Sequence, residues 1–181
     1  MSTSNVPDRS QMKSTDVPGW VALIIAFIFW VILLPLVHAG IPWALSLLTP
    51  RFGWIDGRPA AWNLLGLIPV ALATILLIWL MILHFSRIPK RVKLERTPTY
   101  LLTRGPYKFS RNPMYIAELA LWLGWAILYG SIIVLVGLLI MGPAMNSRVI
   151  AREERDLEAR FGDAYREYKK QVPRWIGKVR G

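Results

Sequence analysis

Two long apolar runs limit what this chain can fold into. The first, WVALIIAFIFWVILLPLVHA, covers Trp20 to Ala39, and the second, WNLLGLIPVALATILLIWLMILHF, covers Trp62 to Phe85. About 20 apolar residues in a helix cross the hydrocarbon core of a bilayer. Each run therefore predicts a transmembrane helix, with Pro35 as the candidate position of a kink. The segment from Gly40 to Leu48, GIPWALSLL, is too short to cross alone and is expected to lie at the membrane interface.

A third apolar region is divided by a turn. Residues Met114 to Tyr129 and Ile132 to Met145 form apolar arms on either side of a Gly-Ser pair. Each arm is short for an independent span, so the small residues between them predict a tight helical hairpin.

These elements together predict an all-α polytopic membrane protein. It would have two N-terminal transmembrane helices, a transmembrane helical hairpin and a cytoplasmic C-terminal amphipathic helix. The expected divisions are a polar N-terminal segment over 1–18, two helices with their connecting loop over 19–85, and a functional core over 86–181. Within that core, a basic loop spans Ser86 to Asn112 and a polar, helix-prone tail starts at Asn146.

The chain is strongly basic, with a formal charge of +11 from 22 basic and 11 acidic residues. A basic chain can indicate a nucleic-acid partner, but basic residues also flank the cytoplasmic ends of membrane helices. The predicted topology places 20 of the 22 basic residues on one side and leaves only Arg51 and Arg58 opposite. This asymmetry predicts cytoplasmic termini and no nucleic-acid partner. The absence of cysteine fits a bacterial inner-membrane protein, and no disulfide or metal site is expected.

The tail is amphipathic when it is drawn as a helix at about 100° per residue. One stripe of this helix carries apolar side chains: Ile150, Leu157, Phe161, Ala164 and Tyr168. Glu154 lies close to this stripe and Glu153 borders its other side, whereas Arg148, Arg152 and Arg155 project away from it. Two interpretations stay open, because the acids either pair with neighbouring arginines on a solvated face or form a carboxylate site at the apolar edge.

One acid lies inside an apolar arm. Glu118 follows the basic loop by about one and a half helical turns. An ionisable group within a span is a functional candidate, because burying it in the membrane is costly. In the structural alternative, Glu118 reaches back to Arg111 or to an amide at the start of the arm.

The loop, the hairpin and the tail supply groups of complementary charge. The helix start at Asn112 and Pro113, with its free amides, suits an anion, and the carboxylates of the tail suit an amine or a sulfonium. S-adenosylmethionine carries a carboxylate, an ammonium, a sulfonium and an adenine, so this set of groups would suit it. Composition alone indicates only a small polytopic membrane protein.

Three strings take the interpretation further. LLTRGPYKFSRNPMY, LGWAILYGS and EERDLEARFGDAYREYKKQVPRW, in this order, resemble the superfamily of isoprenylcysteine carboxyl methyltransferases and phosphatidylethanolamine N-methyltransferases. The resemblance covers Thr99 to Trp175. It implies a membrane methyltransferase that uses S-adenosylmethionine, bound between the loop, the hairpin and the tail. It also implies a lipid-like or prenylated acceptor drawn from the membrane.

The resemblance implies roles for individual residues. The positions that match the cofactor pocket are Leu101, Leu102, Gly105, Tyr107, Asn112, Pro113, Tyr115, Gly124, Glu153 and Glu154. With the acid inside the apolar arm included, the candidate catalytic residues are Arg111, Arg148, Glu118, Glu153 and Glu154. A carboxylate acceptor is ionised at pH 7 and needs Arg111 or Arg148 to hold it. An amine acceptor must lose a proton and needs one of the acids as a base.

Different strings point to different branches of the superfamily. NPMY resembles the phospholipid N-methyltransferases, and Thr99 and Asn112 stand where the carboxyl methyltransferases usually carry histidines. FGDAYREYKKQVPRW resembles the carboxyl methyltransferases along the tail and favours O-methylation of a carboxylate. Phospholipid N-methylation is the alternative. A sterol-reductase-like enzyme and a non-catalytic membrane scaffold are the alternatives of other classes.

Overall fold

The computed structural model of the chain describes residues 16–87, 91–93 and 100–177, and most of them are helical. Three helical runs are long and apolar enough to cross a membrane: Gly19–Ser46, Ala61–Phe85 and Ile132–Phe161. The apolar helix α4 (Pro113–Tyr129) is shorter. Within the described ranges, strands form only two short antiparallel pairs: β1 (Asp16–Pro18) with β4 (Arg91–Lys93), and β2 (Trp54–Ile55) with β3 (Arg58–Pro59). The predicted all-α membrane fold is confirmed.

The first helical run is longer than predicted. It consists of four consecutive segments: α1 (Gly19–Phe27), the π-helical turns η2 (Ile28–Leu33) and η3 (Leu36–Gly40), and α2 (Ile41–Ser46). The prediction of a separate interfacial segment from Gly40 is therefore wrong. Pro35 and Pro42 each lack a backbone N–H, and wider π turns next to them allow the helix to continue without a break.

The second run agrees with its predicted bounds. A 3₁₀ turn, η4 (Ala61–Gly66), leads directly into α3 (Leu67–Phe85). The fully buried side-chain amide of Asn63 donates hydrogen bonds to the carbonyl oxygens of Phe52 (3.1 Å) and Ile127 (2.9 Å). One polar side chain thus ties the connecting loop, the second run and α4 together at this end of the bundle.

The predicted hairpin forms between α4 and α5 (Ile132–Ala144). Gly130 ends α4 at φ +55°, a left-handed conformation that glycine adopts without a Cβ penalty. The tail, however, does not begin as a separate helix, because α5 continues through the π turn η6 (Met145–Ile150) into α6 (Ala151–Phe161). Gly162, at φ +54°, then turns the chain into α7 (Asp163–Gln171).

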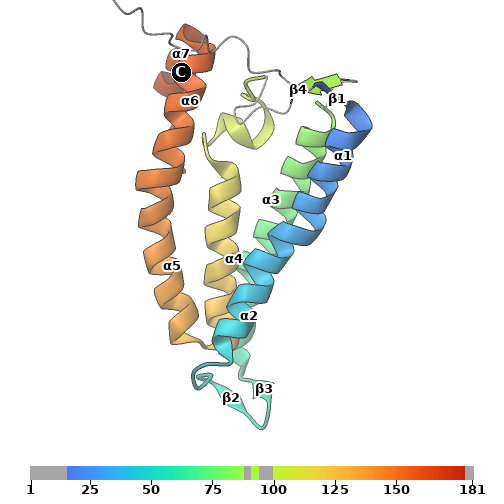
Figure 1. Cartoon of the computed structure of the whole chain (residues 1–181). Helices are drawn as coiled ribbons and strands as arrows, with labels where there is room; N and C mark the ends of the chain where they lie inside the picture. The colour runs from blue at the N-terminus through green and yellow to red at the C-terminus, as the bar shows by residue number, and fades with distance from the viewer. Residues whose placement is uncertain (1–15, 88–90, 94–99, 178–181) are drawn as a thin grey trace, which may run out of the picture.

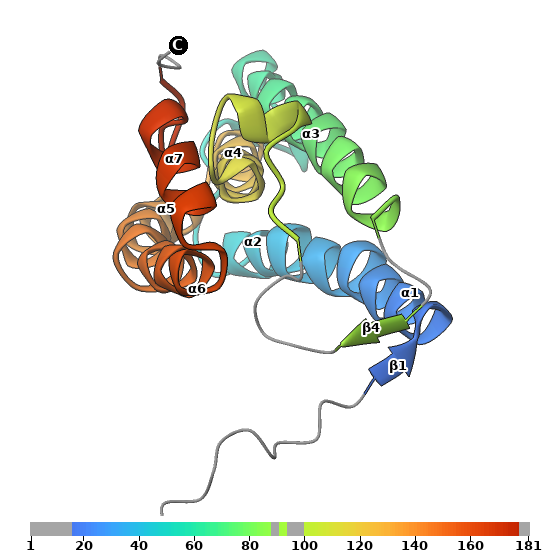
Figure 2. The ribbon, with the colours of Figure 1, turned by 90° about the horizontal axis from the view of Figure 1, so that it is seen from above.

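Helix α4 stands at the centre of the bundle and packs against α3, η4, α5, α2 and η3 (Figure 2). The α2 segment packs against α5 at one end of the bundle, and Figure 1 shows the two runs diverging from there toward the end that carries the tail. That end also holds the β1–β4 pair and a short 3₁₀ turn, η5 (Gly105–Lys108). It is called the loop end below, and the opposite end carries Arg51 and Arg58.

Candidate functional site

A cavity of about 770 Å³ opens at the loop end. Its wall combines η2, the end of α3, residues 100–107, the start of α4, the η6–α6 helix and α7. Small-molecule sites commonly occupy about 300–1,000 Å³. The cavity therefore has the size of a ligand site, and it is built from segments far apart in the sequence.

Eleven of the predicted site residues line this cavity: Leu101, Leu102, Tyr107, Arg111, Asn112, Pro113, Tyr115, Glu118, Arg148, Glu153 and Glu154. Gly105 and Gly124 do not. Gly105 adopts φ +60° at the start of η5, a backbone requirement of the turn itself. Gly124 lies where α4 crosses η4, and a Cβ there would fall 2.7 Å from the carbonyl oxygen of Gly66. A small residue is thus needed at position 124 for helix packing.

Glu154 is enclosed by two arginines. Arg111 donates to Glu154 Oε1 from Nε (3.1 Å) and Nη2 (2.8 Å), and Arg174 donates to Oε2 from Nη2 (2.5 Å). The remaining Arg111 nitrogen, Nη1, donates to the carbonyl oxygens of Lys169 (3.1 Å) and Val172 (2.7 Å). The side chains of Glu154 and Arg111 are only 7% and 10% exposed. Arg111, Glu154 and Arg174 are called the tail clamp below, because they join the loop, α6 and the C-terminal segment.

Further hydrogen bonds hold the segment after α7 against the loop. The backbone N–H of Arg111 donates to the Pro173 carbonyl (2.9 Å). The Ser110 hydroxyl and the Asn112 amide both donate to the Arg174 carbonyl at 3.0 Å. The C-terminal segment is thereby held against the loop, and the Asn112 side chain has a structural partner.

Glu153, next to Glu154 in sequence, has a different environment. It is exposed toward the cavity, and its Oε1 accepts a hydrogen bond of 2.8 Å from the Tyr115 hydroxyl. Successive helical residues point about 100° apart, so one acid enters the tail clamp while the other faces the cavity. The sequence treats the two acids as a pair, and the structure separates them.

Glu118 does not reach back to Arg111, because every Arg111 nitrogen already has a protein partner. The Arg111 pairing of the structural alternative is therefore contradicted. Instead, Glu118 Oε2 lies 3.7 Å from Nε2 of His38, and the Glu118 side chain is 7% exposed. The wall of the cavity on the membrane side thus contains an acid that pairs with no arginine of the residues that the structure describes.

Tyrosines and a histidine complete this part of the wall. His84 Nε2 lies 3.2 Å from the hydroxyl of Tyr107, whose carbonyl accepts a hydrogen bond of 2.7 Å from the Tyr168 hydroxyl. Burial, and to a lesser extent neighbouring Tyr100 and Glu153, raises the pKa of Tyr107, and burial raises the pKa of Tyr165 to about 12. Both hydroxyls therefore stay protonated at neutral pH and can donate hydrogen bonds to a ligand.

Sequence reasoning missed several of these groups. His38 and His84 are the only two histidines of the chain, and each lies in an apolar run. This was a usable signal, since an ionisable group within a span is a functional candidate. Arg174 offered no comparable signal. Arg148 and Arg152 were expected to project away from the apolar stripe, yet both line the cavity. Arg148 lies in η6, where the π turn departs from the 100° register on which that expectation rests.

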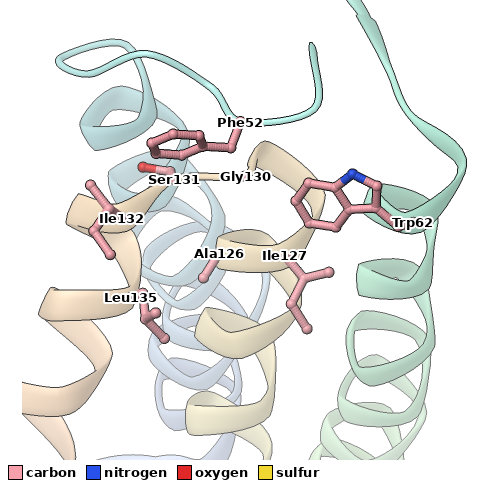
Figure 3. A pocket seen from close by; sticks show the side chains of 8 residues that line it. All are labelled: Phe52, Trp62, Ala126, Ile127, Gly130, Ser131, Ile132 and Leu135. Atoms are coloured by element: carbon pink, nitrogen blue, oxygen red, sulfur yellow. The ribbon is translucent and has the colours of Figure 1, made fainter.

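A second hollow, of about 230 Å³, lies at the opposite end of the bundle. Figure 3 shows its lining of Phe52, Trp62, Ala126, Ile127, Gly130, Ser131, Ile132 and Leu135. Its one side-chain hydroxyl, Ser131, accepts a hydrogen bond from the Val134 N–H at the start of α5. The hollow has no titratable side chain in its wall, so the loop-end cavity is the better candidate site.

The fold and the cavity define a class of protein. It is an integral membrane protein with a ligand cavity at one end of its helical bundle, between a basic loop and a helix that carries acids. The phospholipid methyltransferase family profile matches residues 62–164. This is more than half of the chain, so the chain belongs to that family, and the resemblance found in the sequence is confirmed. S-adenosylmethionine is the usual methyl donor in this family.

Individual relatives agree with the family. A protein-S-isoprenylcysteine O-methyltransferase of Xenopus laevis is 30% identical over 128 residues, covering 70% of this chain and 44% of that protein. The chain thus spans less than half the length of that relative. An uncharacterized protein of Haemophilus influenzae is 41% identical over 63 residues, covering 35% of this chain and all of that protein. No solved structure matches the chain.

Proposed function

We propose that this protein transfers a methyl group from S-adenosylmethionine to a lipid-like acceptor in the loop-end cavity. One observation carries the proposal: the cavity joins polar groups of the loop and tail to apolar residues of the membrane helices. A water-soluble donor and a membrane-bound acceptor need such a meeting point. A non-catalytic scaffold does not require this combination of walls. A sterol-reductase-like enzyme would require it too, and the family profile favours methyl transfer over that alternative.

The residues in the wall suit S-adenosylmethionine, which supplies a methyl group on a positively charged sulfur. Glu153 and Asp156 would hold its ammonium group, and Arg148 and Arg152 its carboxylate. The adenine would lie against aromatic and apolar side chains, for which the wall offers Tyr100, Leu101, Leu102 and Tyr165. The enzyme's contribution is then chiefly to position donor and acceptor and to exclude water.

The acceptor would enter from the membrane. Phe29 on the first run and Val149 on η6 both line the cavity and are exposed at their apolar surfaces. The runs that carry them diverge toward the loop end (Figure 1). An apolar chain could therefore lie between them while its reacting group reaches the cavity.

Two acceptor chemistries have specific support. The Xenopus relative and the tail string favour a carboxylate, and Arg148 lines the cavity without an ion pair among the described residues. The family profile and the membrane-side wall favour an amine, because Glu118 and Glu153 are acids that can attract an ammonium group. Arg111, predicted to hold a carboxylate, has all its nitrogens engaged in the tail clamp.

We also propose that the loop end is cytoplasmic and that the protein resides in a bacterial inner membrane. The charge asymmetry supports this orientation, since 20 of 22 basic residues belong to the loop end in the predicted topology. In intact cells, Ser86→Cys should resist a membrane-impermeant thiol reagent while Ile55→Cys should react. The reverse pattern would invert the topology.

The proposed activity is tested by binding and by transfer. Detergent-solubilised protein should bind S-adenosylmethionine in calorimetry and should not bind NADPH, the cofactor of a sterol-reductase-like enzyme. With S-adenosylmethionine labelled in its methyl group, the label should enter the organic phase of a bacterial lipid extract. Binding of neither compound would favour the scaffold alternative.

A further inference from the structure

The inference starts from an acid that the tail clamp does not use. Glu118 lies on α4, is 7% exposed and lines the cavity. It makes no hydrogen bond within the described residues, and its separation of 3.7 Å from His38 is longer than a hydrogen bond. An ionised acid in a membrane helix is costly unless something compensates its charge. The protein itself leaves that compensation to whatever enters the cavity.

His38, which is not among the residues that line the cavity, lies beside Glu118. Its Nδ1 lies 3.1 Å from the carbonyl oxygen of Leu34. A carbonyl oxygen can only accept, so Nδ1 carries the hydrogen, and Nε2 of the neutral ring offers a lone pair. That lone pair faces a Glu118 oxygen that also has only lone pairs when ionised. Glu118 and His38 attract each other only when one of them carries a proton that the other can accept. The geometry therefore suits a pair that takes up a single proton.

Within the described part of the chain, no lysine or arginine is paired with Glu118. The titratable groups that interact with it are His38 from η3, Glu153 from α6 and Tyr115 on its own helix, while Tyr107 from the loop and His84 from α3 line the same cavity. Arg148 and Arg152 line the cavity on the η6–α6 helix and are exposed. An ammonium group at the membrane-side wall would therefore be attracted to Glu118 and Glu153, whereas a carboxylate there would be repelled.

We infer that Glu118 is the catalytic base for an acceptor whose reacting atom is an amine nitrogen, and that His38 is its positioning residue. This inference rests on the proposed methyl transfer. The ammonium group of the acceptor gives one proton to the Glu118 carboxylate and becomes a neutral amine. The nitrogen lone pair then forms a bond to the methyl carbon as the carbon–sulfur bond breaks. The electron pair of that bond stays on sulfur, and the product is an N-methylated ammonium.

The chemistry predicts a pH dependence. A carboxylate acceptor is ionised throughout pH 6.5–8.5 and should react at a nearly constant rate. An amine acceptor needs a base, so the rate should rise with pH until the base or the amine is deprotonated. Replacement of His38 removes the group that orients and shares the proton of Glu118, so it should shift this profile rather than abolish turnover.

The experiment uses full-length protein in two sets of vesicles. One set contains phosphatidylethanolamine as the amine probe, and the other contains phosphatidylcholine with S-farnesylcysteine, acetylated at its amine, as the carboxylate probe. Wild-type protein should label phosphatidylethanolamine with methyl groups that survive mild alkali. Glu118→Gln should keep S-adenosylmethionine affinity within about threefold and lower the transfer rate about 100-fold, the scale of general-base catalysis. Glu167→Gln, on the exposed face of α7, is the matched control and should transfer at the wild-type rate.

The outcomes separate the inference from the proposed function. Alkali-labile label on S-farnesylcysteine, with a flat pH profile, would overturn the inference and leave the methyltransferase proposal intact. An unchanged rate in Glu118→Gln would do the same. Absence of S-adenosylmethionine binding by the wild type would overturn both. If Glu118→Gln does not fold, His38→Gln decides, because an unaltered pH profile in that variant contradicts the inference.

Discussion

Two buried acids line the same cavity, and their surroundings differ. Glu154 accepts hydrogen bonds from two arginines in the tail clamp, whereas Glu118 has one histidine at 3.7 Å. Both side chains are 7% exposed, so burial does not distinguish them. The difference shows that the partners of a buried acid, and not its burial, indicate whether its role is structural or functional. A fully paired acid holds the structure together, and an acid left without a cation is available to a ligand.

The largest expected effect comes from breaking the clamp. Glu154→Gln leaves Arg111 and Arg174 without their counter-charge in a largely buried place, which typically costs about 3–5 kcal/mol. We expect a strong loss of stability, measured as the unfolding midpoint in detergent. Glu158→Gln removes only partly exposed pairs with Lys169 and Arg166, each worth about 0–1 kcal/mol. Equal, small effects of the two changes would mean that the clamp is not structural.

The second effect sharpens the contrast between stability and turnover. Glu118→Gln should leave the unfolding midpoint nearly unchanged or raise it, because an unpaired buried charge is removed. Its transfer rate, in contrast, should fall about 100-fold, equivalent to about 2.7 kcal/mol. A variant that unfolds as readily as Glu154→Gln would show that Glu118 is structural as well.

The third effect concerns Gly124, which the sequence assigns to the cofactor and the structure places at a helix crossing. Gly124→Ala would press a methyl group against Gly66 and Val70, and such overpacking typically costs about 1–3 kcal/mol. At a temperature where the variant is still folded, its S-adenosylmethionine affinity should equal that of the wild type. A weaker affinity without loss of stability would restore the cofactor role.

The smallest effect concerns the cavity-facing acid of the tail. Tyr115→Phe removes the hydrogen bond to Glu153, which contributes about 0.5–1.5 kcal/mol net. The affinity for S-adenosylmethionine should fall by no more than about tenfold if Glu153 holds the ammonium group. Tyr129→Phe, at the opposite end of the bundle, is the control and should bind normally.

Much of the fold could be predicted from the sequence because membrane spans depend on length and apolarity alone. The second run and the hairpin turn at Gly130 follow this logic and agree with the structure. The continuity of the first and third long runs was missed, since the first was expected to end before Gly40 and the third before the polar tail at Asn146. The π turns η3 and η6 carry the helix across these two points. No local sequence pattern predicts such turns.

Site residues could be predicted where they lie in sequence motifs. The partners that these residues contact elsewhere in the chain could not. The loop and tail strings identified most of the cavity wall, including Tyr107 and Glu153. His38 was missed because it lies in a helix without a motif and far from Glu118 in the sequence. Arg174 was missed although it lies in the tail string, because the string does not show which acid it pairs with. Gly124 shows a different limit of sequence analysis. A small residue is needed where a ligand approaches closely and also where another helix does, and the sequence does not distinguish the two.

The most direct test compares Glu118→Gln and Glu154→Gln side by side for methyl transfer, at a concentration of S-adenosylmethionine that saturates each variant. Transfer is expressed per folded, cofactor-bound molecule, so that loss of stability does not count as loss of catalysis. The account predicts that folded Glu154→Gln transfers label to lipid at a rate near that of the wild type, while Glu118→Gln is about 100-fold slower. Label transfer by Glu118→Gln at the wild-type rate, or slow transfer by folded Glu154→Gln, would contradict the assignment of one acid to chemistry and the other to structure.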